Sequence, residues 1–193
     1  FAAAKVNSCG AHLAVFVTIP PSQTAASGKP PATPKPGSFL HWIDRATGKE
    51  SWQAEYDQGT VCLGADGAVL QTGKELIGID TATGKPRWRT AINKAAIWRE
   101  PARAGDAWVL VDDLNQTMEV YDAGSGELRY RLKLDAPLCF DPLYADSGDV
   151  FLYTNAKDGV SVSCLHAATG QLRWKSSIVE TSSAGAPAAT RGL

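Results

Sequence analysis

The chain has 193 residues, of which 44% are hydrophobic, and its 19 basic and 20 acidic side chains give a formal net charge of −1. Ordinary hydrophobic content with balanced charge excludes a globally disordered chain, and a chain of this length buries roughly 70% of its unfolded surface. The lack of a basic excess argues against a nucleic-acid partner. The longest purely apolar run, residues 13–17, is far shorter than the roughly 20 residues that a membrane-spanning helix needs.

Short β-type segments recur along the chain, and helix signals are almost absent. Several of these segments alternate apolar and polar residues with a period of two, which is typical of a strand with one buried face. The segments predicted as strands are, in chain order, 13–19, 39–43, 68–71, 76–79, 107–111, 118–121, 128–134, 150–153 and 160–165. A further innermost strand is expected ahead of each group, around Cys9, Cys62, Trp98 and Cys139.

A short motif, Asp-x3-Gly-x3-Trp, occurs in four copies, with Tyr for Trp in the third copy and His for Asp in the fourth. The terminal aromatic residues are Trp52, Trp88, Tyr130 and Trp174, at intervals of 36, 42 and 44 residues. A period near 40 with strand-like flanks is typical of propeller blades. The sequence therefore predicts an all-β propeller of four four-stranded antiparallel blades, at about 1–57, 58–92, 93–135 and 136–179.

Two segments do not fit the blade pattern. Residues 20–38 carry six of the 11 prolines and separate two strands of the first blade. Such a segment cannot build a core, so we interpret it as a surface insertion, with a docking arm for a partner as the alternative. Residues 180–193 are rich in Ser, Ala and Gly and are interpreted as a C-terminal linker or tail.

The form Asp-x-x-Thr-Gly-Lys-x-x-Trp resembles the repeat of pyrroloquinoline-quinone (PQQ)-type β-propellers, over nearly the whole chain. The resemblance implies that the aromatic residue of each blade packs against the next blade near its turn glycine. The docking residues so implied are Trp52, Trp88, Tyr130 and Trp174, with Gly48, Gly84, Gly126 and Gly170 as the turn glycines. Tyr130 offers less area than Trp, and His166 replaces the aspartate expected to cap the fourth turn.

Rings of this family usually hold about eight blades, whereas four are visible here. An open half ring would expose two apolar blade faces. We therefore expect the chain to be part of a larger ring, with two chains closing one ring, or a closed four-bladed ring, as the alternatives.

The four cysteines allow three full pairings, and sequence alone does not choose between them. Our hypothesis is that Cys9 pairs with Cys62 and Cys139 with Cys164, which would suit an oxidising compartment; four reduced thiols are the alternative.

Residues Trp98, Arg99 and Glu100 place a large aromatic ring and two charges on an innermost segment, where they are candidate partner-binding residues. The alternative is that Trp98 fills space between blades. No phosphate-binding loop, nucleophile motif or metal-ligand spacing is found, so no catalytic, cofactor-binding or metal site is predicted.

The resemblance implies a non-catalytic scaffold that binds protein partners outside the cytoplasm, like the bacterial outer-membrane assembly lipoprotein or the sensor propellers of some receptor kinases. The partner would be another protein, or a second chain that completes the ring. One alternative is a fragment of a quinone-dependent alcohol or sugar dehydrogenase, and the other is a structural subunit of a cell-envelope complex.

Overall fold

The computed structural model describes residues 3–9, 12–19, 37–56, 59–64, 67–96, 98–139, 144–156 and 159–179. Within these ranges the chain is all β, with sixteen strands in four antiparallel sheets of four strands each. Each sheet is built from consecutive strands paired with their neighbours in sequence, which confirms the predicted propeller blades. Most of the Pro-rich segment and the whole of the predicted tail, residues 20–36 and 180–193, lie outside the described residues.

We number the sheets as blades one to four in chain order. Blade one holds β1 (Ala3–Cys9), β2 (His12–Ile19), β3 (Gly37–Asp44) and β4 (Glu50–Tyr56). Blade two holds β5 (Gly59–Gly64), β6 (Gly67–Thr72), β7 (Glu75–Ile79) and β8 (Pro86–Ala91). Blade three holds β9 (Ala102–Ala104), β10 (Ala107–Asp112), β11 (Thr117–Asp122) and β12 (Leu128–Lys133). Blade four holds β13 (Tyr144–Asp146), β14 (Asp149–Ala156), β15 (Gly159–His166) and β16 (Leu172–Val179).

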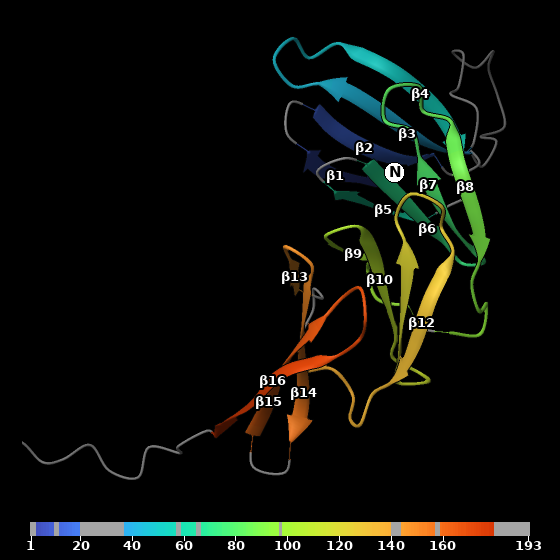
Figure 1. Ribbon diagram of the computed structural model, residues 1–193. Coiled ribbons are helices and arrows are strands. Elements are labelled where there is room, and N and C mark those ends of the chain that lie inside the picture. Colours follow the sequence, from blue (N-terminus) through green and yellow to red (C-terminus); the bar gives the residue numbers. More distant parts are fainter. Residues whose placement is uncertain are drawn as a thin grey trace, which may run out of the picture.

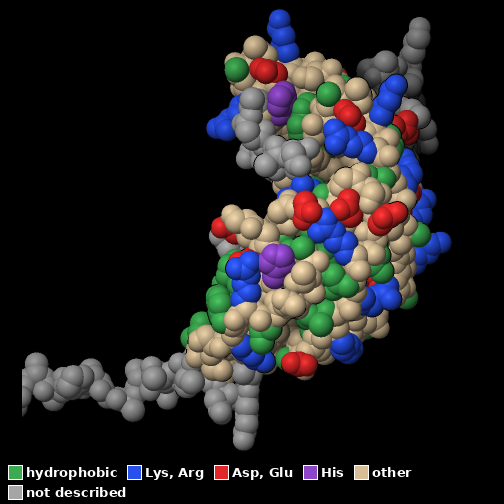
Figure 2. Space-filling view, in the orientation of Figure 1, with side chains coloured by type: hydrophobic (Ala, Val, Ile, Leu, Met, Phe, Trp, Pro, Cys, Tyr) green, Lys and Arg blue, Asp and Glu red, His purple; other side chains and the backbone are tan. Residues whose placement is uncertain are grey.

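The four blades follow one another along an open arc (Figure 1). The innermost strands β1, β5, β9 and β13 contact one another in this order along the concave side. The outermost strands β4, β8 and β12 lie on the convex side, where charged side chains are spread over the surface (Figure 2). Blades one and four are therefore the two ends of the arc.

A shared hairpin joins the third and fourth strands of every blade. In each blade the register shifts by a bulge just before the turn, between Trp42 and Ile43 in blade one and at the matching positions of the others. The turn closes on a glycine with positive φ, from 68° at Gly48 to 74° at Gly126. A residue with a Cβ is strained in this conformation, which explains the glycine of the repeat.

The hydrophobic core lies between successive blades. One cluster joins blades one and two through Leu40, Trp42 and Leu70, all of which are fully or almost fully buried. A second cluster joins blades two and three, and a third joins blades three and four around Val109 and Leu152. Because the blades bury their faces against each other, each one depends on its neighbours for stability.

The innermost strands of blades three and four differ from the prediction. The sequence places them around Trp98 and Cys139, whereas the structure begins them at Ala102 and Tyr144. Trp98 forms only an isolated bridge with Asp112. In blade three the ladder is interrupted ahead of Ala102 by Pro101, which has no N–H to donate. The backbone N–H of Cys139 still donates to the carbonyl of Tyr153 at 2.8 Å, so both segments follow the inner edge of their blade.

Candidate functional site

The predicted docking residues Trp52 and Trp88 lie against the turns of the following blades. The indole Nε1–H of Trp52 donates to the carbonyl of Thr81 at 2.8 Å, and that of Trp88 donates to the carbonyl of Ala123 at 3.1 Å. Both acceptors directly follow the aspartate that opens the turn. The two contacts are therefore the same contact repeated between blades one and two and between blades two and three.

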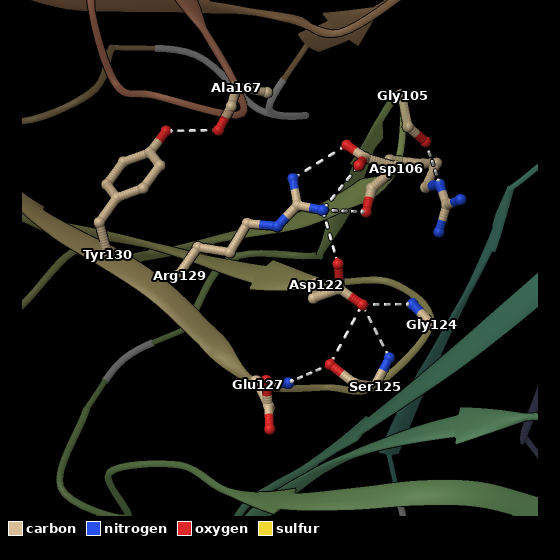
Figure 3. Close-up of polar contacts among 10 residues, drawn as sticks. Gly105, Asp106, Asp122, Gly124, Ser125, Glu127, Arg129, Tyr130 and Ala167 are labelled. Atoms are coloured by element: carbon tan, nitrogen blue, oxygen red, sulfur yellow. Dashed lines mark hydrogen bonds and ion pairs between the residues drawn. The ribbon is translucent and has the colours of Figure 1, made fainter.

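Tyr130 makes the equivalent contact between blades three and four. Its hydroxyl donates to the carbonyl of Ala167 at 2.7 Å (Figure 3). A Cβ at Gly170 would lie close to its ring, so the ring lies beside that glycine. Burial raises the pKa of Tyr130, so the phenol stays protonated and keeps donating at neutral pH. The smaller ring thus preserves the hydrogen bond that the indoles make elsewhere.

The turn glycines allow this close approach. A Cβ added at Gly84 would overlap the ring of Trp52, and one at Gly126 would overlap the ring of Trp88. A Cβ at Gly170 would lie 2.9 Å from the ring of Tyr130. The glycine is therefore required twice, by its positive φ and by the aromatic ring that covers it.

Two further residues, which follow the docking Trp on the outermost strand, also contact the turn of the next blade. The hydroxyl of Tyr56 donates to the carbonyl of Gly84 at 2.8 Å, and that of Thr90 donates to the carbonyl of Gly126 at 2.6 Å. The repeat motif does not predict these residues, because they follow its aromatic position and differ between the four copies. The sequence offers one signal for them. Tyr56 lies four residues after Trp52 and Thr90 lies two residues after Trp88, and an even spacing along a strand places them on the same face as the Trp.

The turn glycine of blade one and the docking aromatic residue of blade four have no partner of this kind among the described residues. No described atom lies within 4 Å of the position that a Cβ would occupy at Gly48. Trp174 is 44% exposed and packs at a tilt on Phe151, with ring centroids 6.1 Å apart. Gly48 and Trp174 therefore take no part in the three internal docking contacts and lie at opposite ends of the arc, so their docking role stays a prediction.

A charged network supports the turn of blade three (Figure 3). Asp122 accepts hydrogen bonds through Oδ1 from the backbone N–H groups of Gly124 and Ser125, at 2.9 and 2.8 Å. The guanidinium of Arg129 donates to Oδ2 of Asp122 at 2.6 Å and to both carboxylate oxygens of Asp106. The hydrogen bond from Arg129, followed by that from Ser125, lowers the pKa of Asp122 to about 2. The carboxylates of this turn are thus held ionised in structural contacts.

Blade four replaces this network because His166 occupies the aspartate position. Oγ1 of Thr169 lies 3.3 Å from Nδ1 of His166, whereas in blade two Thr83 is bound through N–H and Oγ1 to the carboxylate of Asp80. Arg173, which would otherwise meet the turn aspartate, lies 2.9 Å from Oδ1 of Asp149 instead. The fourth turn keeps its backbone shape with fewer side-chain caps.

The candidate partner-binding residues Trp98, Arg99 and Glu100 lie together at the inner edge of blade three. The indole of Trp98 donates to the carbonyl of Asn93 at 3.0 Å. Arg99, whose side chain is only 10% exposed, pairs with Asp113 at 2.7 Å and donates to the carbonyl of Leu138 at 3.1 Å. Because Leu138 precedes blade four, Arg99 links two blades, whereas Trp98 and Glu100 keep partly exposed side chains.

The predicted disulfide between Cys139 and Cys164 is not formed. Cys62, Cys139 and Cys164 are thiols in the structure, and the side chain of Cys9 lies outside the described residues. The Sγ of Cys62 donates to the carbonyl of Pro101 at 2.7 Å in the next blade. Cys164 is buried, and burial followed by the nearby carboxylate of Asp149 raises the pKa of its thiol. The pairing of Cys139 with Cys164 is a correction: Cys139 lies along the inner edge of β14, whereas Cys164 pairs across the other edge with Phe151.

Grooves lie between successive blades, and charged side chains line two of them. One of about 310 Å3 between blades two and three is lined by Arg87, Trp88, Arg103, Asp106 and Asp122 among others. Another, of about 410 Å3 between blades one and two, is lined by residues that include Glu55, Glu75 and Arg89. Among the described residues, no group of three or more His, Cys, Asp or Glu side chains is placed to hold a metal ion.

Four-stranded blades locked by an aromatic ring on the glycine turn of the next blade define a β-propeller of the PQQ-type repeat class. The sequence profile of the family described as outer membrane protein assembly factor BamB matches residues 37–101 and 94–193. The chain belongs to this family. No curated protein matches the sequence significantly.

Solved structures share the fold. BamB from Moraxella catarrhalis superposes with a TM-score of 0.56 at 20% identity, over 76% of this chain and 47% of that one. A quinohemoprotein alcohol dehydrogenase from Comamonas testosteroni superposes with a TM-score of 0.52 at 15% identity, over 86% of this chain and 33% of that one. The Pan2 WD40 domain from Neurospora crassa superposes with a TM-score of 0.54 at 13% identity, over 86% of this chain and 46% of that one. The chain thus spans less than half the length of these structures. No helix in the described part of the chain is long and apolar enough to cross a membrane.

Proposed function

We propose that this chain is a protein-binding scaffold of the BamB type, working outside the cytoplasm rather than catalysing a reaction. The observation that carries the proposal is the family match over residues 37–193, whose description is an outer-membrane assembly factor. The proposal treats residues 1–179 as one domain of propeller blades, with 20–38 as an inserted loop and 180–193 as a linker or tail. The fold alone would not distinguish a scaffold from an enzyme.

The chemistry of the turns supports this proposal. The carboxylates of Asp44, Asp80 and Asp122 accept backbone hydrogen bonds within their own turns. Arg87 and Arg129 pair with two of these carboxylates. These ionised groups stabilise the hairpins, and such fixed pairs do not change protonation near neutral pH as acid–base catalysts must.

The surface offered to a partner would lie on the turns, the hairpin tips and the inner edge. Leu114, at the tip between β10 and β11, is 60% exposed and is the most exposed large hydrophobic residue described. Trp98 and Glu100 keep their predicted role as partner contacts at the inner edge, because both are partly exposed. Arg99 contributes by fixing the segment that carries them.

Site-specific photo-cross-linking tests partner binding directly. A photoreactive amino acid at Leu114 or Trp98 should give discrete adducts with another protein in envelope extracts, identified by mass spectrometry. The same amino acid at Ala91, exposed on the outermost strand of blade two, is the matched control for non-specific reaction. Adducts that are identical at all three positions, or none at any, would contradict a specific scaffold.

A dehydrogenase is the second candidate, since a quinohemoprotein alcohol dehydrogenase shares the fold. The purified chain, supplied with pyrroloquinoline quinone and calcium, should not reduce a redox dye with alcohols or aldoses as substrates. Dye reduction that disappears when calcium is chelated would overturn the scaffold proposal.

A further inference from the structure

Each internal blade boundary uses the same row of side chains on the outermost strand. The row starts at the docking aromatic residue and continues every second residue on the same face. Its last member is Tyr56, Ile92 or Leu134 in blades one to three, and these side chains are only 8%, 7% and 6% exposed. The next blade covers them.

The corresponding row on blade four is uncovered. Trp174 and Ile178 on β16 point to one face and are 44% and 55% exposed. Ile178 is the counterpart of the buried residues that end the row in the other blades. We call this surface, Trp174 and Ile178, the tail face.

Blade one presents the complementary surface. In blades two, three and four, one cross-strand pair of the second and third strands faces the preceding blade. These pairs, which occupy matching register positions, are Ala68–Ile79, Trp108–Tyr121 and Val150–Leu165. The preceding blade leaves each of these side chains 5% exposed or less. The same register position in blade one holds Leu13 and Ile43, which stay partly exposed. Together with the open turn at Gly48, these two residues form the head face.

The turn at Gly48 is built like those that receive an aromatic ring. Asp44 accepts hydrogen bonds from the N–H and Oγ1 of Thr47 at 2.7 and 2.8 Å, as Asp80 does from Thr83 in blade two. The carbonyl that would accept the incoming indole belongs to Arg45, the residue after the aspartate. The turn is thus formed before any ring covers it.

We propose that the tail face of one copy of this chain docks on the head face of a second copy, with Trp174 over Gly48 and its indole N–H donated to the carbonyl of Arg45. A second copy is the occupant because it supplies both halves of a contact that the chain already makes three times internally. The chain covers 47% and 46% of two propeller structures, so two copies have about the length of one ring.

Closure follows from the shape of the arc. A head-to-tail contact either closes into a ring or continues as an open polymer. An arc spanning about half of a ring closes with two copies, and both pairs of end faces are then buried. This inference concerns assembly and does not depend on the proposed scaffold function.

Sedimentation velocity on the full chain tests the inference. The wild type should sediment as a dimer at micromolar concentrations. Trp174→Ala and Ile178→Glu should each weaken dimerisation at least about tenfold, as expected for loss of a central aromatic or a buried apolar contact. Leu172→Ala, which removes an equally exposed apolar side chain from the opposite face of β16, should leave the dimer unchanged.

The head face is tested by Gly48→Ala with Gly148→Ala as its matched control. Both glycines have positive φ and no described atom within 4 Å of an added Cβ, so both variants carry backbone strain alone. Only Gly48→Ala should weaken the dimer. Mixing Trp174→Ala with Gly48→Ala chains should restore one of the two contacts and give a heterodimer tighter than either homodimer.

Three outcomes would overturn the inference. They are a wild-type chain that stays monomeric at tens of micromolar, a dimer insensitive to the face variants, and open polymers in place of a dimer. None of these would touch the proposed scaffold function, which the dye and cross-linking experiments address separately.

Discussion

At the scale of single residues, the turns are held by carboxylates that stay ionised. Asp122 shows this most clearly, because Arg129 and two backbone N–H groups all favour its charged form. Asp106 is drawn into the same network and its pKa is lowered by its hydrogen bonds to Arg129. Arg129 connects this turn to Asp106, which lies in the hairpin between β9 and β10 (Figure 3).

The pKa of Asp122 gives a testable pH dependence. Its folded pKa of about 2 lies below the ordinary 3.8, so its contribution to stability is complete above the ordinary value and is lost as pH falls through about 2. A carbon-detected NMR titration should show this low midpoint. Arg129→Met removes the largest cause and should move the midpoint toward 3.8. A wild-type midpoint near the ordinary value would contradict the network.

Tyr130 offers a second prediction at this scale. Tyr130→Phe keeps the ring over Gly170 but removes the hydrogen bond to the carbonyl of Ala167. The free energy of unfolding should fall by about 1 kcal/mol, as for a typical lost hydrogen bond. Urea denaturation measures this change. If Tyr130→Phe were neutral while Tyr130→Ala destabilised strongly, the contact would be one of packing alone.

At the scale of elements, the bulged hairpin and its glycine turn are the repeating unit. Gly126→Ala would place a Cβ into the ring of Trp88 and impose strain at φ 74°. We expect a loss of about 2–5 kcal/mol, the sum of left-handed strain and overpacking.

Gly148→Ala is the control for Gly126→Ala, because it carries positive φ without a nearby ring. Its cost should be only about 1–2 kcal/mol, from backbone strain. Thermal or urea unfolding of the two variants gives the comparison. Equal costs would show that the ring does not press on the glycine.

The sequence predicted the blades and the aromatic residues of the three internal contacts because both depend on local pattern. Period-two alternation and the spacing from Asp to Gly to Trp are visible without a structure. The hydroxyls of Tyr56 and Thr90 were missed because their acceptors, in the next blade, lie 28 and 36 residues away in sequence. The starts of β9 and β13 were missed because edge strands are short and interrupted, so alternation carries little signal there.

The predicted pairing of Cys139 with Cys164 was wrong for a related reason. Cysteine spacing does not reveal which edge of a strand a residue occupies, and Cys139 and Cys164 lie along opposite edges of β14. Whether two side chains meet depends on register between strands far apart in the chain.

At the scale of the whole molecule, the protein is an arc of blades with two unlike ends. Three internal boundaries bury the rows that start at the docking aromatic residue, whereas the fourth row exposes Trp174 and Ile178 on the surface. An apolar surface of this kind marks an interaction site. In the assembly that we propose, these two ends dock on a second copy, and the hairpin tips and the inner edge stay available to a protein partner.

The central claim is that an aromatic ring of each blade covers the turn glycine of the next, and the Hα chemical shifts of the turn glycines test it most directly. Aromatic rings shift protons above their faces upfield, so Gly84, Gly126 and Gly170 should show upfield Hα signals at every concentration. Gly48 should show a normal shift in dilute solution and move upfield only as the chain associates. Ordinary shifts at the three internal glycines would contradict the account.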